Sequence, residues 1–412
     1  MRVLAYTSPA RGHLNPMMGP LLELRRRGAE VHVRTLSSQV ESVRAAGIEC
    51  EPIAAGAEAI VHDDHEAKSQ IRAGQRSFAT FARRAPHDAP DFEQALASVR
   101  PDVAIVDVSC YGAKAVAERE GIPWAESRPF LLEEAAPGVP PFGLGLRPMR
   151  GPAGRLRDGV LGLTSKAFDR KARLPAVNTG RKAAGIAPLA GGDQWRHRAP
   201  LTLYFTAEPF EYRRPLPPGV EMVGPGEWDT QAELPVALPE DDRPLALVAC
   251  SSEFQDDGEI AAAALAGLGS GDWRLAITTA GVDPQSLGEH GDALVARFLP
   301  HSPLLERASV VVCHGGMGVT QKALAHGIPV CIVPWARDQL DVAAHVLEAG
   351  AGTKLPRKRL SPVRLAEAAA EALACAPGAA KVRAGYERAG GAARAAELVE
   401  GLAEREGAVQ IP

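Results

Sequence analysis

The segment SVVVCHGGMGVTQKALAHGIPVCIVPWARDQ occupies residues 309–339 of the 412-residue chain. An apolar run ends at His314, a turn with three glycines follows, and a helical pattern continues to Gly327 before a second apolar run. This alternation of strand and helix is typical of a doubly wound parallel sheet. Glycines let the backbone approach a bulky anion, and a helix that begins there presents unpaired N–H groups to it. We therefore predict a diphosphate site on this turn, with His314 as a further hydrogen-bond donor.

Two other loops are predicted to reach the same edge of this sheet. In an open parallel sheet, the carboxyl ends of the strands face one crevice. Asp338 and Gln339 follow the second apolar run, and a carboxylate beside a carboxamide suits vicinal hydroxyl groups, which need both acceptors and donors. Ser251 and Ser252 follow the strand pattern LALVAC at 245–250. We expect their hydroxyl and N–H groups to reach the same phosphates.

The first half of the chain shows a similar alternation. A strand is predicted at residues 2–7, and a helix follows from the N-cap Asn15 to Gly28, with Pro16 at its first position. PDVAIVDV at 101–108 has the pattern of a buried strand followed by a helix. These features predict a second doubly wound sheet.

The domain organisation is predicted from length and from changes in composition. A chain of 412 residues favours two domains. Residues 55–95 are irregular and partly polar, and the Pro- and Gly-rich stretch 129–195 is expected to form loops and helices over a cleft. The predicted units are an acceptor-side domain at 1–215, a Pro-rich linker at 216–243, a nucleotide-side domain at 244–390, and a helix at 391–412 that packs back toward the first domain.

Composition limits the classes of partner. The formal net charge is −4, so no basic excess recruits nucleic acid or an anionic membrane. The six cysteines include no CxxC pair, which favours a reducing, cytoplasmic compartment. No apolar run reaches about 18 residues, so no membrane-spanning helix is expected. We expect a monomer or a homodimer that binds small molecules.

A histidine and an aspartate are predicted to meet in the first domain. His13 ends the turn after the first strand, and Asp107 ends the buried strand at 101–108. A helix N-terminus disfavours the imidazolium form, so His13 should be neutral and able to act as a general base. It then needs a partner that fixes its tautomer, and Asp107 is the best candidate.

Several acidic clusters are expected to be solvated rather than to bind metal. The densest is His62-Asp63-Asp64-His65-Glu66, in a polar stretch without strand or helix support. Metal binding there is the less favoured alternative. Glu240-Asp241-Asp242 and Asp256-Asp257 are likewise expected to be solvated turns.

The pattern HGGxG…ALxxGIPxxxxPxxxDQ resembles the donor motif of the family 1 GT-B glycosyltransferases, and the resemblance covers nearly the whole chain. It implies a GT-B fold, in which two Rossmann-like domains face a central cleft. It also implies that GHLNP carries the general base, that the configuration at the sugar inverts, and that no metal or other cofactor is needed beyond the nucleotide sugar. The residues implied in donor binding are His314, Gly316, Met317, Gly318 and Val319 at the diphosphate, Asp338 and Gln339 at the sugar, and Phe298 and Leu299 at the base.

Two positions depart from the family pattern. Members that use UDP-sugars usually carry a glutamate, which grips both ribose hydroxyls, where this chain has Lys322. A charged lysine accepts no hydrogen bond, so a 2′-hydroxyl gains little here. A TDP-sugar is therefore at least as favoured as a UDP-sugar. Val342 stands where an asparagine often follows the Asp-Gln pair, which leaves the identity of the sugar open.

The acceptor pocket is expected to be apolar and to bind an aromatic or polyketide-like aglycone. Its candidate residues are Phe78, Phe81, Trp124, Phe130, Phe142, Leu144 and Leu146. The favoured function is transfer of a hexose or deoxyhexose to a hydroxyl of such an aglycone in natural-product biosynthesis. The alternatives are a detoxifying UDP-glucose transferase, a GT-B sugar epimerase, and a catalytically inactive auxiliary protein.

Overall fold

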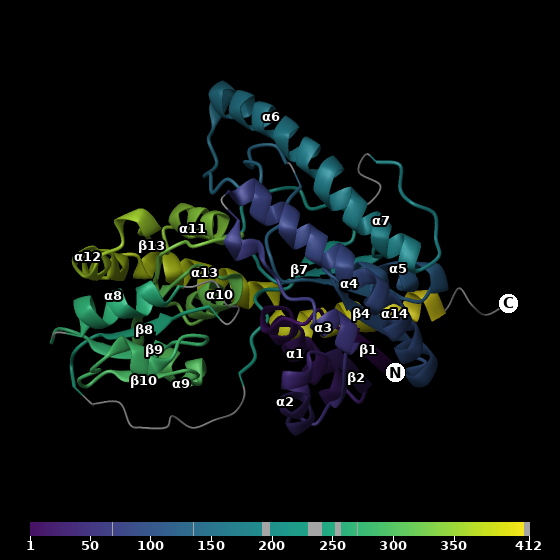
Figure 1. Ribbon diagram of the computed structural model, residues 1–412, viewed down its shortest axis with the longest axis horizontal. Coiled ribbons are helices and arrows are strands. Elements are labelled where there is room, and N and C mark those ends of the chain that lie inside the picture. The colour runs from purple at the N-terminus through teal and green to yellow at the C-terminus, as the bar shows by residue number, and fades with distance from the viewer. Residues whose placement is uncertain are drawn as a thin grey trace.

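The computed structural model describes residues 1–67, 69–134, 136–191, 198–229, 241–251, 257–269 and 271–407. Two parallel sheets, of seven and six strands, each carry helices on both faces and form two lobes (Figure 1). The predicted fold class, two Rossmann-like doubly wound domains, is therefore confirmed. All pairings between neighbouring strands are parallel.

The order of strands in the first sheet places a crevice between two of them. In spatial order the strands are β3 (Glu49–Pro52), β2 (Glu30–Thr35), β1 (Arg2–Tyr6), β4 (Val103–Asp107), β5 (Trp124–Arg128), β6 (Leu201–Tyr204) and β7 (Val220–Met222). The chain runs outward from β1 to one edge and then from β4 to the other. Loops that leave β1 and β4 therefore diverge, and a ligand crevice opens between their carboxyl ends.

Helices cover both faces of this first sheet. The helices of the domain are α1 (Arg11–Arg26), α2 (Val40–Ala45), α3 (Ala55–Glu58), α4 (Gln70–Val99), α5 (Tyr111–Glu120), α6 (Gly151–Phe168) and α7 (Leu174–Ala183), of which α6 extends away from the sheet (Figure 1). α1 begins at Arg11, before the predicted start at Pro16, so His13 lies in its first turn. Pro16 removes only one bond near the helix end, and the buried Leu14, Met17 and Met18 stabilise the longer helix.

The prediction of irregular structure over residues 55–95 is wrong for most of that stretch. α4 extends over 30 residues, from Gln70 to Val99, although it contains Pro86 and Pro90. Prolines usually end a helix because they lack the N–H and crowd the preceding turn. Here buried residues at helical spacing, including Ala85, Ala89 and Phe92, pack against the first domain and outweigh that cost.

The second sheet repeats the same arrangement. Its strands in spatial order are β10 (Leu294–Ala296), β9 (Arg274–Thr278), β8 (Leu245–Ala249), β11 (Ala308–Cys313), β12 (Val330–Ile332) and β13 (Gly352–Lys354). The direction of winding reverses between β8 and β11, so a second crevice opens there. The helices are α8 (Gly258–Leu268), α9 (His301–Leu305), α10 (Met317–Ala325), α11 (Gln339–Glu348), α12 (Pro362–Leu373) and α13 (Ala376–Ala389).

The connection between the domains begins later than the sequence predicts. β7, at Val220–Met222, pairs with β6 inside the stretch predicted as linker from residue 216. A strand of three residues flanked by prolines has no recognisable strand pattern in the sequence, so it is not predicted. The last helix, α14 (Gly391–Gly407), lies on the first domain beside α1, where Ala395 and Val399 join its core (Figure 1).

Candidate functional site

The two crevices face one cavity of about 1120 Å³ between the domains. Its walls include the loop after β1, the end of β4, the loop after β8 and the glycine turn after β11. Both topological switch points therefore open into the same space, as expected for a protein that holds two ligands against each other.

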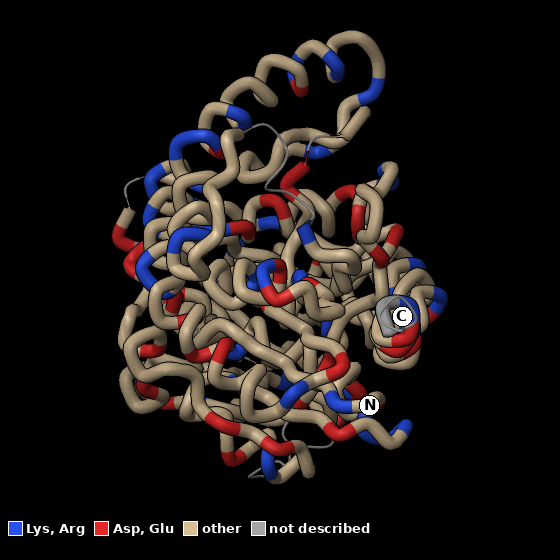
Figure 2. Tube along the Cα trace, turned by 90° about the vertical axis from the view of Figure 1, so that its right-hand side faces the viewer, with Lys and Arg blue, Asp and Glu red and all other residues tan. Residues whose placement is uncertain are grey.

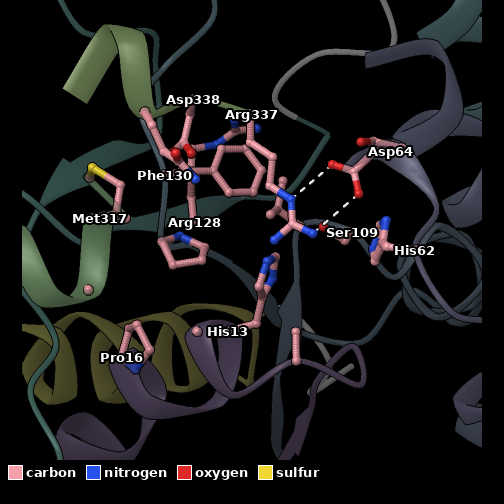
Figure 3. A pocket seen from close by; sticks show the side chains of 18 of the residues that line it. His13, Pro16, His62, Asp64, Ser109, Arg128, Phe130, Met317, Arg337 and Asp338 are labelled. Carbon is pink, nitrogen blue, oxygen red and sulfur yellow. Dashed lines mark hydrogen bonds and ion pairs between the residues drawn. The ribbon is translucent and has the colours of Figure 1, made fainter. Parts of the chain in front are cut away.

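His13 and Asp107 meet at the first switch point. His13 Nδ1 lies 2.6 Å from Asp107 Oδ2, and Asp107 is fully buried. Asp107 Oδ1 accepts a hydrogen bond of 2.7 Å from the Ser109 N–H, which fixes the plane of the carboxylate. A carboxylate in this position holds the proton on Nδ1 and leaves Nε2 as the acceptor of the imidazole. In Figure 3 the ring of His13 points into the cavity, close to Phe130.

The glycine turn occupies the second switch point. Gly315 has φ of 91°, a conformation that favours glycine, and Gly316 is the N-cap of α10. A Cβ on Gly316 would lie 2.5 Å from His314 Nε2, so only glycine fits beneath that ring. Burial lowers the pKa of His314, and Nδ1 accepts no hydrogen bond from the residues described. The turn therefore presents a neutral histidine and the N-terminus of α10, with Met317, Gly318 and Val319, to the cavity.

The loop after β8 is organised by an aspartate that the sequence interpretation placed in a solvated turn. Asp257 is 3% exposed, and its Oδ2 accepts a hydrogen bond of 2.8 Å from the Ser251 N–H. The Ser251 amide is therefore engaged within the protein, although the residue lines the cavity beside His314. Ser252, predicted to contact the phosphates, lies outside the described residues.

Asp338 and Gln339 line the cavity at the end of the β12 loop, but they differ in accessibility. Gln339 is 2% exposed, and its Oε1 accepts hydrogen bonds from the Trp335 and Ala336 N–H groups at 2.7 and 2.9 Å. The carboxamide oxygen thus holds the loop in shape. Asp338 is partly exposed, and burial raises the pKa of its carboxyl group.

An ion pair joins the domains across this site, and the sequence interpretation missed it. Arg337 Nε and Nη2 lie 2.8 and 3.2 Å from the two carboxylate oxygens of Asp64 (Figure 3). Asp64 is only 2% exposed. Burial acts to raise the pKa of Asp64, but the hydrogen bonds and charge of Arg337 outweigh it and lower that pKa. Arg337 has φ of 57°, a left-handed conformation that costs about 1–2 kcal/mol for a residue with a side chain.

The predicted solvated loop at His62–Glu66 is therefore wrong in part. Asp64 is buried at the domain interface, and the His62 ring packs edge-on against Phe81 at 5.3 Å. Burial, followed by the charge of Arg84, lowers the pKa of His62 to about 3. Among the described residues, no group of three or more His, Cys, Asp or Glu side chains is placed to hold a metal ion.

The residues predicted to frame the base, Phe298 and Leu299, both line the cavity. The Phe298 ring is 57% exposed, and the guanidinium of Arg11, from the other domain, lies 4.8 Å from its centroid. Leu299 lines the cavity and packs into the core of the second domain. Next to them Lys322 forms an ion pair with Asp229, a residue of the interdomain connection.

The acceptor-side prediction holds in part. Phe78, Phe81, Phe130, Phe142 and Leu144 line the cavity. Trp124 and Leu146 do not line it. Trp124 begins the central strand β5, is 3% exposed and packs in the core, because a strand covered by helices on both faces buries its side chains on both sides.

The acceptor wall is also more polar than predicted. A row of ion pairs runs along it: Lys114 with Glu126, Glu126 with Arg128 at 2.9 Å, Arg128 with Glu133 at 3.4 Å, and Glu133 with Arg173 at 2.9 Å. The Arg128 and Arg173 guanidinium groups stack on Phe130 and Phe78. The wall therefore offers flat aromatic surfaces beside fixed hydrogen-bonding groups, and it is not purely apolar.

Two further features concern the surface and the helices of the described part of the chain. Basic and acidic residues are interspersed along the chain in Figure 2. None of the helices in the described ranges is long and apolar enough to cross a membrane.

Comparison with known proteins gives consistent matches. Residues 262–389 match the family model of the erythromycin biosynthesis protein CIII-like C-terminal domain. The chain is 31% identical to 4′-demethylrebeccamycin synthase of Lentzea aerocolonigenes, over 97% of this chain and 99% of that protein. The solved structure of the kitacinnamycin glycotransferase superposes with a TM-score of 0.74 and 24% identity, covering 97% of this chain and 98% of the other. The glycosyltransferase VinC in complex with dTDP has a TM-score of 0.70 and 21% identity, covering 98% and 100%.

Proposed function

Because this chain belongs to the GT-B glycosyltransferases of antibiotic biosynthesis, we propose that it moves a hexose or deoxyhexose from a nucleoside diphosphate to a hydroxyl of a small hydrophobic aglycone, with inversion. The observation that carries the proposal is the His13–Asp107 pair, which opens into the same cavity as the glycine turn after His314. A proton acceptor and an anion site thus face one space, where two substrates can react.

The proposed reaction begins at His13. Its Nε2 takes the proton of the acceptor hydroxyl as that oxygen attacks the anomeric carbon of the sugar. The bond between that carbon and the phosphate oxygen breaks, and the nucleoside diphosphate leaves with the bonding electrons. Attack opposite to the leaving group inverts the configuration. Asp107 holds Nδ1–H and stabilises the imidazolium that forms.

The leaving group gains negative charge as the bond breaks, and the second domain is built to receive it. The N-terminus of α10 supplies backbone N–H groups and the positive end of the helix dipole. The guanidinium of Arg337 lies at the same cavity, between His13 and Asp64 in Figure 3. Donors fixed before reaction stabilise developing charge without reorganising, and no step of this scheme needs a metal ion.

A TDP-sugar is the favoured donor in this proposal, with a UDP-sugar as the alternative. Lys322 replaces the glutamate that members using UDP-sugars usually carry, and a structural neighbour of the same fold holds dTDP. The acceptor is proposed to be a planar aglycone with polar edges, because aromatic rings and ion pairs alternate along the wall. A detoxifying UDP-glucose transferase is the competing function. The complete His13–Asp107 pair argues against an inactive auxiliary protein.

The test is an array of TDP- and UDP-sugars against aromatic and polyketide aglycones, with products identified by mass spectrometry. We expect a glycoside whose anomeric configuration, read by NMR, is opposite to that of the donor. His13→Ala should lose transfer while thermal-shift titration still detects nucleotide binding, and His314→Ala should weaken that binding. Normal turnover by His13→Ala, or a product with retained configuration, would overturn the mechanism.

A further inference from the structure

A carboxylate from another part of the chain lies beside Lys322. Lys322 lies on α10, one turn beyond the glycine turn, and is 9% exposed. Its ammonium group forms an ion pair with Oδ2 of Asp229. Asp229 comes from the connection between the domains, 93 positions away in the sequence. Lys322 itself accepts no hydrogen bond, but Asp229 places an acceptor beside it.

The contacts of the Asp229 carboxylate are concentrated on one of its two oxygens, Oδ2. Its Oδ2 accepts hydrogen bonds from the Ser302 N–H at 2.9 Å and from the Ser302 hydroxyl at 2.8 Å, in addition to the contact with Lys322. Burial acts to raise the pKa of Asp229, but the charge and hydrogen bonds of Lys322 and Ser302 outweigh it, so the pKa is lowered and the group stays ionised. No hydrogen bond from the described ranges reaches Oδ1.

The pair lies where a bound nucleotide would place its pentose. Phe298, Leu299, Gly316, Lys322 and Asp229 all line the cavity. Ser302, which holds Asp229, follows Phe298 and Leu299 at the start of α9, and Lys322 lies on α10, which begins at the glycine turn. A nucleoside diphosphate whose base reaches Phe298 and whose phosphates reach Gly316 must pass its sugar ring beside this pair.

The hydrogen-bonding capacity of the pair matches one hydroxyl group rather than two. Lys322 offers N–H donors only, and Oδ1 is the one oxygen of Asp229 that no hydrogen bond from the described ranges engages. One hydroxyl can accept from the ammonium group and donate to Oδ1. A vicinal 2′-hydroxyl would have to share Oδ1 with the 3′-hydroxyl, and it would exchange its hydrogen bonds to water for that shared contact.

We propose that Lys322 and Asp229 form a pentose-reading site that binds a single 3′-hydroxyl and selects 2′-deoxynucleoside diphosphates over ribonucleotides. This inference rests on the proposed use of a nucleotide sugar. The absence of the ribose-binding glutamate alone would only remove a contact with ribose. Here the Lys322–Asp229 ion pair, which includes a residue of the interdomain connection, selects the deoxyribose.

The test separates the pentose from the base with four nucleotides: TDP, dUDP, UDP and 5-methyl-UDP. Binding of each to the full-length protein is measured by calorimetry. We expect TDP and dUDP to bind at least tenfold more tightly than UDP and 5-methyl-UDP, whereas the 5-methyl group changes affinity by less than about threefold. Equal affinity for all four, or a preference that follows the methyl group, overturns the inference.

Variants assign the effect to the pair. Asp229→Asn should weaken the two deoxynucleotides about tenfold and remove the discrimination. Lys322→Glu combined with Asp229→Asn should favour UDP, because it supplies a carboxylate with both oxygens accessible. Glu221→Gln is the matched control, since this carboxylate on β7 pairs with Arg394 at 3.9 Å, does not line the cavity and should leave the discrimination unchanged.

The outcomes distinguish this inference from the proposed function. If no nucleotide binds, both are overturned. If all four nucleotides bind with equal affinity and His314→Ala weakens them, the donor site stands and the pentose-reading site does not. Discrimination that survives in Asp229→Asn but disappears in Glu221→Gln also overturns the assignment. Thermal unfolding of each variant checks that it folds, and Lys322→Met offers a second variant without a charge should the double substitution fail to fold.

Discussion

Replacing Asp107 with asparagine should reverse the proton arrangement of His13 without moving either residue. The Ser109 N–H donates to Oδ1 at 2.7 Å, so it will hold the amide oxygen of the asparagine at that position. The amide nitrogen then takes the place of Oδ2, 2.6 Å from His13 Nδ1. An N–H donor there pairs with an unprotonated Nδ1, which puts the imidazole proton on Nε2 and blocks the base.

The size of the loss follows from two costs. The productive tautomer would set two donors against each other in a buried site, which costs about 1–3 kcal/mol for the unmet hydrogen bond. The imidazolium formed during the reaction also loses a hydrogen bond to a charged group, worth about 1.5–3 kcal/mol. At about 1.36 kcal/mol for each factor of ten, the sum predicts a fall in kcat of roughly 10²- to 10⁴-fold.

The assay is steady-state transfer with the best donor and aglycone from the product array, normalised to active sites counted by nucleotide binding. Because Asp107 is remote from the glycine turn in the sequence and lies in the other domain, nucleotide affinity should stay within about threefold of the original. A kcat within threefold of the unmodified enzyme would refute the assignment of the pair. A parallel loss of nucleotide binding would instead indicate a folding defect.

Three further predictions concern the second domain. Gly316→Ala should weaken nucleotide binding at least tenfold in calorimetry, because its Cβ would lie 2.5 Å from His314 Nε2. Arg337→Gly should lower the free energy of urea unfolding by about 1–3 kcal/mol, since leaving Asp64 unpaired outweighs the relieved backbone strain, and adding Asp64→Asn should restore it. Asp341, on α11, is 5% exposed and accepts hydrogen bonds from the Gly143 and Gly145 N–H groups. Burial raises the pKa of its carboxyl group to about 6, so its ionisation disfavours the folded state: the free energy of unfolding should fall by about 3 kcal/mol between about pH 4 and pH 6, and Asp341→Asn should flatten this profile.

The site residues that follow buried strands are the ones whose location the sequence predicts. A buried apolar run identifies a strand, and the rule for parallel sheets then places the residues after it at one edge. This rule places His13, Asp107, His314 and Asp338 at strand ends, and all four line or adjoin one cavity. The rule works because it needs only local patterns and the fixed handedness of the fold.

Contacts between distant loops were not predictable in this way. Asp64 and Arg337 are 273 positions apart, and no local pattern links them. The polar neighbours of Asp64 predict a solvated loop, but a carboxylate that is buried at an interface and paired with one arginine has the same sequence context as a carboxylate in water. The same applies to Asp257, whose role as acceptor for the Ser251 amide depends on the return of the chain after a loop.

Lys322 shows how a departure from a family pattern can mislead when it is considered alone. In the sequence, the lysine is a lost acceptor, which predicts that a TDP-sugar is at least as favoured as a UDP-sugar. The structure instead places a carboxylate beside it, with one oxygen saturated by Ser302 and the lysine itself. The expected donor is the same, but the reason changes from an absent contact to a selective one. Only the second reason predicts that removing Asp229 destroys a preference for TDP, so that variant decides between them.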